Sequence, residues 1–178
     1  MTPPPVIRPA ATADLIGLMS VRPDERLHRE RLASQDAGAL AYLVASASPL
    51  PISGEGPRAG NNAVYGFVLL LWAGDEQHPS RPVLADLLVR ELYRCRGLGA
   101  RLMERAEALC RARDLPQIGL SVNPTDNPRA HALYLRRGYR DTGQPPHCEQ
   151  SSLTDAGGRF RLHEDWCLSL AKDLTPRS

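Results

Sequence analysis

One stretch of this sequence constrains the fold more than any other, because an apolar strand runs there through a glycine turn into a helix. The strand is expected over Val83–Val89, the turn carries Gly97 and Gly99, and the helix begins near Leu98. The apolar positions of the helix are Leu98, Leu102, Ala106 and Leu109. Their spacing follows the helical period of about 3.6 residues, which predicts an amphipathic helix.

This turn is suited to hold a phosphate group. The first amides of a helix have no intrahelical acceptor, and the helix dipole places partial positive charge beside them. Gly97 and Gly99 lack Cβ atoms, so an anion can approach the backbone, and Arg94 and Arg96 add positive charge. The pattern is not the dinucleotide-binding fingerprint, because Leu102 stands where a third glycine would fall. No Gly-Lys-Ser/Thr follows, which excludes a Walker loop.

Length and composition indicate a globular protein of one domain. The chain has 178 residues, of which 42% are hydrophobic and 24% charged. A net charge of +2 does not suggest a protein that coats nucleic acid or an anionic membrane. The start does not resemble a signal peptide and the longest apolar run, 63–73, is too short to span a bilayer, so we expect a cytoplasmic protein. The four cysteines are widely spaced and are interpreted as reduced thiols.

Helices and strands are expected to alternate along the chain, which predicts a mixed α/β domain. Strands are expected at 6–8, 41–45, 64–72, 83–89, 117–123, from Tyr139, and at 165–170; helices are expected at 10–20, 24–33, 98–115 and 127–138. Two long polar loops are expected at 46–62 and 144–161. We divide the chain into a flexible leader at 1–5, a domain at 6–174 and a tail at 175–178.

Three segments resemble the GNAT superfamily of N-acetyltransferases, in the order of that family. Arg94-x-x-Gly97-x-Gly99, preceded by Leu87-x-Val89, resembles its acyl-CoA pyrophosphate motif. Asn127-x-x-Ala130-x-x-Leu133-Tyr134, followed by Gly138-Tyr139, is similar to its second conserved segment. Ile7-Arg8-Pro9-Ala10, with Thr12 and Asp14, is similar to its first strand and helix. The resemblance covers the chain from about Val6 to Leu174.

The resemblance implies an α/β (α+β) single-domain fold. Its mixed, mostly antiparallel sheet of about seven strands would be flanked by helices. The strands that end at Val89 and Asn123 would splay apart and hold acyl-CoA between them. The implied cosubstrate is acetyl-CoA, with no metal. Its implied binding residues are Leu87, Leu88, Val89, Arg94, Cys95, Arg96, Gly97, Leu98, Gly99, Ala100, Asn127 and Tyr134.

The resemblance also implies catalytic roles for Leu87 and Tyr134. The Leu87 amide would stabilise the oxyanion of a tetrahedral intermediate, and Tyr134 would protonate the leaving thiolate, since a phenol and an alkyl thiol are of similar acidity. The alternative for Tyr134 is a tyrosine packed in the core, and for Asn127 a plain helix N-cap, which is compatible with cofactor binding.

The general base is not identified by the sequence. Some relatives carry a glutamate four residues before the oxyanion amide, where this chain has Val83. Asp86 is the carboxylate of that strand, and it would either deprotonate the amine or attract a cationic substrate. The alternative is a structural ion pair with an arginine such as Arg90 or Arg101.

The leading hypothesis is an N-acetyltransferase that moves the acetyl group directly to a primary amine of a small molecule or peptide. One alternative is an acyl-CoA-binding module without catalysis. A nucleic-acid-associated enzyme is a further alternative, but acidic residues interrupt the arginines between 90 and 113. His147, Cys148 and His163 lack the short spacing of a metal site. The partners expected are acetyl-CoA and an amine acceptor that the two long loops help to bind, and the protein would be a monomer or a homodimer.

Overall fold

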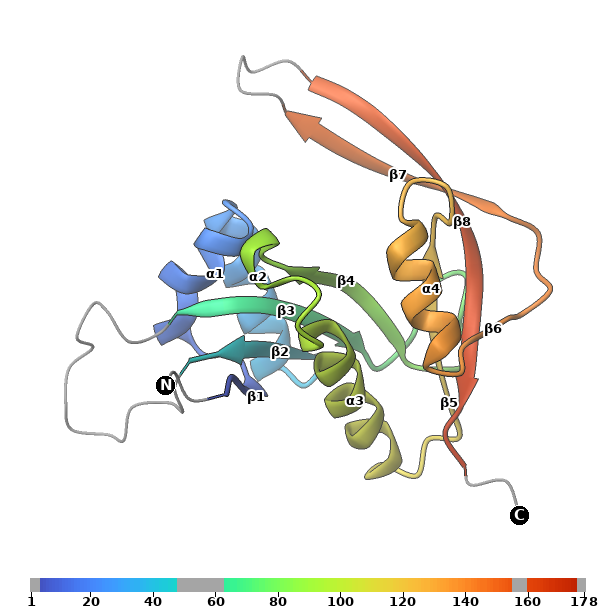
Figure 1. The fold of residues 1–178 in the computed structure, drawn as a ribbon, viewed down its shortest axis with the longest axis horizontal. Coiled ribbons are helices and arrows are strands. Elements are labelled where there is room, and N and C mark those ends of the chain that lie inside the picture. Colours follow the sequence, from blue (N-terminus) through green and yellow to red (C-terminus); the bar gives the residue numbers. More distant parts are fainter. Residues whose placement is uncertain (1–3, 48–62, 155–159, 176–178) are drawn as a thin grey trace.

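The fold is a single sheet with helices on both faces (Figure 1). A computed structural model describes residues 4–47, 63–154 and 160–175. The strands are β1 (Val6–Pro9), β2 (Leu40–Ser46), β3 (Val64–Leu71), β4 (Val83–Val89), β5 (Gln117–Val122), β6 (Arg140–Asp141), β7 (His147–Thr154) and β8 (Phe160–Asp173). The helices are α1 (Leu15–Val21), α2 (Glu25–Asp36), α3 (Leu98–Arg111) and α4 (Pro128–Arg136), with 3₁₀ turns η1 (Thr12–Asp14) and η2 (Glu91–Tyr93).

The strand order is β1-β2-β3-β4-β5-β8-β6, and β7 pairs with β8 outside this path. Every described pairing is antiparallel except β4 with β5, which is parallel. The expected mixed, mostly antiparallel sheet is therefore confirmed, with eight strands in place of about seven. The one parallel contact lies at its centre, between the two strands expected to splay.

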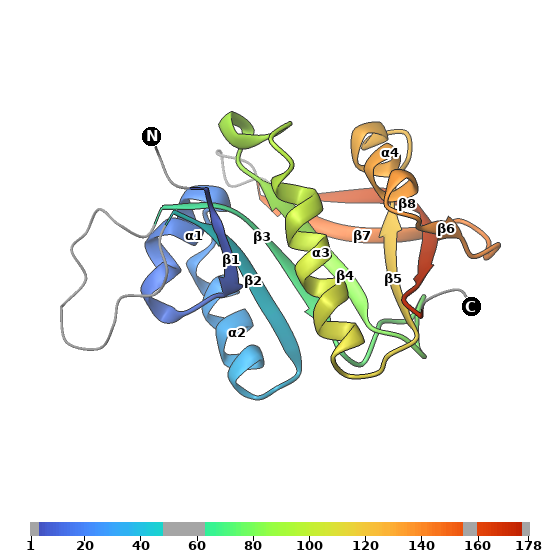
Figure 2. The same ribbon diagram turned by 60° about the horizontal axis from the view of Figure 1, so that its bottom comes forward.

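The inner strands are buried on both faces, which explains their nearly continuous apolar sequence. Along β2, Tyr42 and Val44 belong to one core cluster, whereas Leu43 and Ala45 belong to the other. The first cluster packs under α1 and α2, and the second packs under α3 (Figure 2). Strand alternation thus assigns successive residues to opposite layers.

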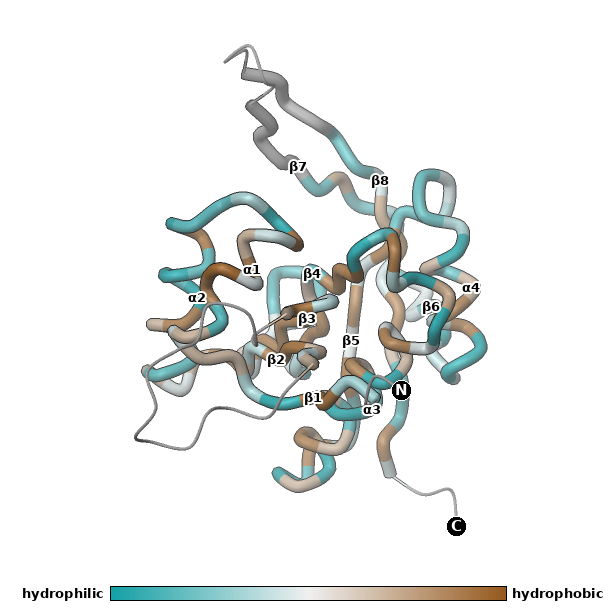
Figure 3. The backbone as a smooth tube through the Cα atoms, turned by 60° about the vertical axis from the view of Figure 1, so that its left-hand side comes forward, coloured by the Kyte–Doolittle hydropathy of each residue, from teal (hydrophilic) through white to brown (hydrophobic). Residues whose placement is uncertain are grey.

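The late part of the chain differs from the expectation. Most of the predicted loop at 144–161 is strand, since β7 pairs with β8 over eight residue pairs from His147↔Cys167 to Thr154↔Phe160. The last strand is accordingly 14 residues long. This hairpin extends away from the body (Figure 1), and its described part is largely hydrophilic (Figure 3). The sequence of β7 lacks apolar alternation, so the sequence pattern did not reveal this strand. The predicted loop at 46–62 falls, from residue 48, outside the described residues, as do 1–3 of the leader and 176–178 of the tail.

A buried ion pair secures the N-terminal strand. Arg8 of β1 donates from Nη1 and Nη2 to the two carboxylate oxygens of Asp14, both at 2.7 Å. Asp14 is fully buried and also accepts from the Ala11 amide at 2.9 Å, so its carboxylate closes the turn before α1. The expected helix at 10–20 consequently begins as the 3₁₀ turn η1 and becomes α-helical at Leu15.

The turn between β3 and β4 packs directly on β5. The His78 ring is 1% exposed and lies against Gly119, where an added Cβ would come within 2.5 Å of His78 Cδ2. Asp75 holds the ring, since its Oδ1 lies 3.0 Å from His78 Nδ1. Glycine at position 119 therefore allows a side chain of the hairpin to lie flat on the neighbouring strand.

A second buried carboxylate, Glu107 on α3, joins the helix to the far side of the sheet. Lys172 Nζ of β8 and Arg137 Nη2 donate to its Oε2 at 2.7 Å and 3.0 Å, and the Tyr139 hydroxyl donates to its Oε1 at 3.3 Å. Burial would raise the pKa of Glu107, but the hydrogen bonds from Arg137 and Lys172 outweigh it and lower the pKa below its ordinary value. Burial and the nearby Glu107 raise the pKa of Tyr139, so the phenol stays a donor.

We expect Glu107→Gln to lower the free energy of unfolding at pH 7 by about 3 kcal/mol, because the cations around it lose their counter-charge. Because the pKa of Glu107 is depressed in the folded chain, its contribution is complete above the ordinary value of 4.5 and is lost as the pH falls below it. The difference between wild type and variant should thus shrink from about pH 5 toward pH 3 in urea unfolding. The control is Glu104→Gln, an exposed carboxylate of the same helix, and an equal loss in both variants would contradict this account.

Candidate active site

The two central strands separate soon after they meet. Parallel pairing of β4 with β5 consists of Val83↔Gly119 and Leu84↔Leu120 alone. Beyond Leu84 the strands diverge, so the backbone of β4 from Ala85 onward has no β5 partner among the described residues. The expected splay of these strands is confirmed, and it leaves polar backbone groups available to a ligand.

A bulge in β4 lies at the start of this gap. Leu69 of β3 pairs with Ala85, and Phe67 pairs with Leu88, so β4 contains one residue more than its partner over this interval. Asp86 takes a φ of +52°, a conformation that is uncommon outside glycine. Asp86 and Leu87 consequently lack a ladder partner in either neighbouring strand as described.

The strained residue is held by two arginines. Asp86 Oδ2 accepts from Arg22 Nη1 at 2.7 Å and forms a second short ion pair with Arg31 Nη2. Arg22 follows α1 and Arg31 belongs to α2, so both come from the helical layer below the sheet. The Arg31 guanidinium also lies over the rings of Tyr42 and Phe67, at 5.9 Å and 5.6 Å from their centroids.

Asp86 is thus an ion-paired carboxylate, but its partners are not the arginines named from the sequence. Arg90 lies over the Tyr93 ring instead, 5.7 Å from the ring centroid. Arg101 Nη2 donates to the Pro5 carbonyl at 2.8 Å. Both are close to Asp86 in sequence, whereas the observed partners are 64 and 55 residues away.

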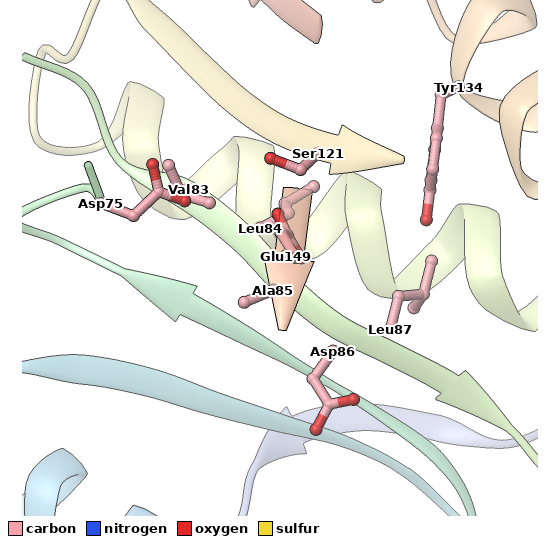
Figure 4. Close-up of a pocket in the computed structure, with 9 residues that line it drawn as sticks. All are labelled: Asp75, Val83, Leu84, Ala85, Asp86, Leu87, Ser121, Tyr134 and Glu149. Atoms are coloured by element: carbon pink, nitrogen blue, oxygen red, sulfur yellow. The ribbon is translucent and has the colours of Figure 1, made fainter. Parts of the chain in front are cut away.

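A cavity of about 170 Å³ lies where the strands diverge (Figure 4). Its lining combines five residues of β4 with one residue from each of four other segments: the turn between β3 and β4, β5, α4 and β7. The lining residues are Asp75, Val83, Leu84, Ala85, Asp86, Leu87, Ser121, Tyr134 and Glu149. Leu87 and Tyr134 therefore meet at one cavity, and the hydroxyl end of Tyr134 points toward Leu87 (Figure 4).

Tyr134 is 9% exposed and packs within the core cluster, with its ring 6.2 Å from that of Tyr139. Its place in the core and its place on the cavity are compatible, so neither interpretation from the sequence excludes the other. Burial raises the pKa of Tyr134 to about 12. The hydroxyl therefore keeps its proton throughout the physiological range and acts as a donor.

The glycine turn leads into α3 as expected. Gly97 is its N-cap residue, with a φ of +76° and open space where a Cβ would stand. No side chain caps the helix among the described residues, so the first amides of α3 are left for another acceptor. Cys95 also has a positive φ, of +60°, and Arg94, Cys95 and Arg96 are exposed.

Gly99 lies in the first turn of α3, near α4 and β4. An added Cβ there would lie 3.5 Å from Leu133 and 3.8 Å from Leu87, which are ordinary contact distances, so packing does not require a glycine at this position. Leu98 and Ala100 belong to the same first turn, and Leu98 is 4% exposed in the core.

The remaining predicted residues flank this gap. Leu88 packs against the core under α1 and α2, whereas Val89 packs against the core under α3. Asn127 is the N-cap residue of α4 and Pro128 is at its start, as the sequence predicts. The Asn127 side chain makes no capping hydrogen bond and is exposed, so its amide is accessible at the helix start.

Three residues near the cavity, Ser121, His147 and Glu149, were not predicted from the sequence to act together; His147 was weighed only as a metal ligand. Ser121 was seen only as part of a strand, and His147 and Glu149 were placed in a loop. His147 Nε2 lies 3.3 Å from Ser121 Oγ and 3.1 Å from Glu149 Oε1. The sequence does contain one signal for this pair: the ionisable residues at 147 and 149 are two positions apart, so in a strand their side chains lie on the same face.

Other site types find no support in the described part of the chain. No group of three or more His, Cys, Asp or Glu side chains there is arranged to hold a metal ion. The thiols of Cys95, Cys110, Cys148 and Cys167 are free. Among the helices described, none is long and apolar enough to cross a bilayer.

Comparison with known sequences identifies a family. Residues 18–139 match the profile of the Acetyltransferase (GNAT) family. The chain is 30% identical over 89 residues to the uncharacterized protein YxbD of Bacillus subtilis (strain 168). This match covers 50% of this chain and 51% of YxbD. The chain thus spans about half the length of the curated relative that it matches.

Comparison with solved structures shows the same architecture over nearly the whole chain. A GNAT superfamily phosphinothricin acetyltransferase from Sinorhizobium meliloti, in complex with acetyl-CoA, gives a TM-score of 0.65 at 16% identity, covering 97% of this chain and 89% of that one. A ribosomal-protein-alanine N-acetyltransferase from Brucella melitensis gives 0.62 at 18% identity, covering 94% and 99%. The ribosomal-protein-S18-alanine N-acetyltransferase from Escherichia coli gives 0.61 at 16% identity, covering 98% and 96%. At such identities the likeness concerns the fold.

We expect Asp86→Asn to lower the free energy of unfolding by about 1–2 kcal/mol, because it leaves the Arg31 guanidinium, 12% exposed, without a counter-charge. Asparagine tolerates a positive φ, so the change tests the ion pairs and not the bulge. Urea unfolding measures the effect. Glu91→Gln, an exposed carboxylate just beyond the same strand, serves as the control, and equal stability of Asp86→Asn and wild type would refute the holding role of the arginines.

Proposed function

Because this chain belongs to the GNAT acetyltransferase family, we propose that it transfers the acetyl group of acetyl-CoA directly to a primary amine. The observation that carries this proposal is the cavity between β4 and β5, which Leu87 and Tyr134 line together. A phosphinothricin acetyltransferase of the same fold was solved with acetyl-CoA, which supports this donor. The acceptor is a small molecule or a peptide.

In the proposed complex the pantetheine arm lies along Leu87, Leu88 and Val89, where β4 has no β5 partner. The pyrophosphate accepts from the amides of the turn from Cys95 to Ala100, beside Arg94 and Arg96. Uncapped amides at the start of α3 and the exposed basic residues favour an anion at this position. Asn127 contacts the cofactor arm from the start of α4.

The proposed reaction has two steps and needs no acyl-enzyme. The amine lone pair attacks the thioester carbon, and the Leu87 amide donates to the resulting oxyanion; such a donor is typically worth about 3 kcal/mol. The carbon–sulfur bond then breaks, and Tyr134 donates to the departing thiolate. Burial raises the pKa of Tyr134 to about 12. The phenol therefore stabilises the departing thiolate mainly by donating a hydrogen bond to it, and full transfer of the proton is less favoured.

The role of Asp86 is narrower than that of a free base. Its ion pairs with Arg22 and Arg31 stabilise the carboxylate in the bulge that presents Leu87. We propose that it orients the Leu87 amide, and that any attraction of a cationic substrate is reduced by the two adjacent guanidinium groups.

An acyl-CoA-binding module without catalysis remains the second candidate. A buried tyrosine would look the same in both proteins, so Tyr134 alone does not decide between them. Substitution of Tyr134 and measurement of turnover separate the two.

The first prediction of this proposal concerns binding. We expect saturable calorimetric binding of acetyl-CoA, and binding of acetylpantetheine, which lacks the pyrophosphate, that is weaker by at least about tenfold, because charge-assisted hydrogen bonds to the turn are lost. Equal affinities would remove the glycine turn from the site. Complete absence of acetyl-CoA binding would refute the proposed donor.

The second prediction concerns catalysis. Tyr134→Phe keeps the buried ring but removes the donor, so turnover with acetyl-CoA and an amine acceptor should fall by about 100-fold or more. The dissociation constant of acetyl-CoA should change little. Thiol release measures turnover and calorimetry measures binding. Unchanged turnover would exclude Tyr134 from the mechanism, and wild-type protein that binds acetyl-CoA but acetylates no amine would favour the binding module.

A further inference from the structure

We propose that Glu149 is the general base that takes the proton from the acceptor ammonium, and that His147 positions it. This inference rests on the proposed function, because an amine must lose a proton before its nitrogen can attack. It assigns a role that the family resemblance and the comparisons leave open.

Glu149 has the location that a base requires. It lines the cavity together with Leu87 and Tyr134, the residues proposed to act on the thioester (Figure 4). It reaches the cavity from β7, whereas Leu87 belongs to β4 and Tyr134 to α4. An acceptor between these elements would meet a carboxylate on one side and the reacting carbonyl on the other.

The contacts of His147 orient Glu149. The imidazole is 12% exposed, and its Nδ1 is buried without a hydrogen-bond partner among the described residues. A carboxylate only accepts, so Nε2 donates to Glu149 Oε1 at 3.1 Å, and Ser121 Oγ lies 3.3 Å from the same nitrogen.

Glu149 differs in this way from the other carboxylates of the cavity. Asp86 is neutralised by two arginines. Asp75 Oδ1 accepts from the backbone amides of Gln77 and His78 and from the His78 ring, all within its own turn. Glu149 accepts from the His147 ring, and no arginine or lysine in the described structure lies within ion-pair distance of it. It is therefore the carboxylate of the cavity that a substrate ammonium would neutralise.

The surrounding charges strengthen this preference for a cation. Asp165 stands directly opposite Glu149 across the β7–β8 pair and forms a short hydrogen bond with Asn123. Asp75 also lines the cavity, whereas the Asp86 carboxylate is paired with Arg22 and Arg31. A second carboxylate nearby favours a bound ammonium ion by simple Coulomb attraction.

The proposed step balances in protons and electrons. One N–H bond of the ammonium breaks, its proton moves to a carboxylate oxygen of Glu149, and the electron pair stays on nitrogen. That pair attacks the thioester carbon, and the carbon–sulfur bond later breaks as the thiolate leaves. Glu149 returns its proton to solvent after the amide departs. After attack the nitrogen of the tetrahedral intermediate carries two protons and a positive charge; one of these protons passes to solvent, and the other stays as the N–H of the product amide.

Two probes of equal size test the inference, methylamine and hydroxylamine. At pH 7 methylamine is almost entirely an ammonium ion, whereas hydroxylamine is mostly neutral, so only methylamine must lose a proton before it can attack. We expect Glu149→Gln to lower kcat/KM for methylamine by about 100-fold and that for hydroxylamine by less than about threefold, after subtraction of the uncatalysed rate. Glu104→Gln, on the exposed face of α3, should leave both rates unchanged.

His147 is tested by the same two probes. His147→Phe removes the donor to Glu149 and should slow methylamine more than hydroxylamine, whereas His147→Gln, which keeps an N–H, should recover most of the lost rate. An equal loss on both probes, or no loss, in Glu149→Gln would overturn the assignment, since a structural defect does not distinguish an ammonium from a neutral amine. If the wild type binds acetyl-CoA but acetylates neither probe nor any other amine, the proposed function fails and the inference fails with it.

Discussion

Parallel pairing between β4 and β5 stops after Leu84, and the whole site depends on that stop. A sheet that stayed paired would satisfy the backbone of β4 internally and leave no room for a ligand. The bulge at Asp86 shifts the register of β4 relative to β3. Asp86 has a positive φ there, and this conformation costs a non-glycine residue on the order of 1 kcal/mol. Arg22 and Arg31 form ion pairs with Asp86 in this bulge, so residues of the N-terminal helical layer contact the segment of β4 that carries Leu87.

The carboxylates of this molecule fall into two kinds, which differ in burial and in their cationic partners. The structural carboxylates, Asp14 and Glu107, are buried and saturated with cationic or hydrogen-bonding partners, as burial of a charge requires. Glu149, by contrast, lies at a cavity, is 51% exposed and accepts from His147. Arg8, Arg22, Arg31 and Arg137 thus pair with structural carboxylates, whereas Glu149 has no arginine or lysine partner in the described structure.

Much of the fold could be predicted from the sequence, because its signals are local. The strand, glycine turn and α3 follow from apolar spacing, and Asn127-Pro128 marks the start of α4 within a few residues of Tyr134. The partners of Asp86 could not be predicted, since ion pairs formed over 64 and 55 residues leave no pattern in the chain. Strand β7 was missed for a related reason: it pairs with β8 through its backbone, and its sequence has no apolar alternation to reveal it.

The contact between His78 and Gly119 restricts which substitutions these two positions can accept. A side chain at position 119 would overlap the His78 ring. It could be accommodated if a smaller residue replaced His78. Neither change is neutral alone, because the first creates a clash and the second removes packing where β4 and β5 meet. Positions 78 and 119 are 41 residues apart in the sequence (119 − 78), yet we expect substitutions at them to be coupled during evolution. The turn between β3 and β4 and the central strand β5 are therefore expected to change together.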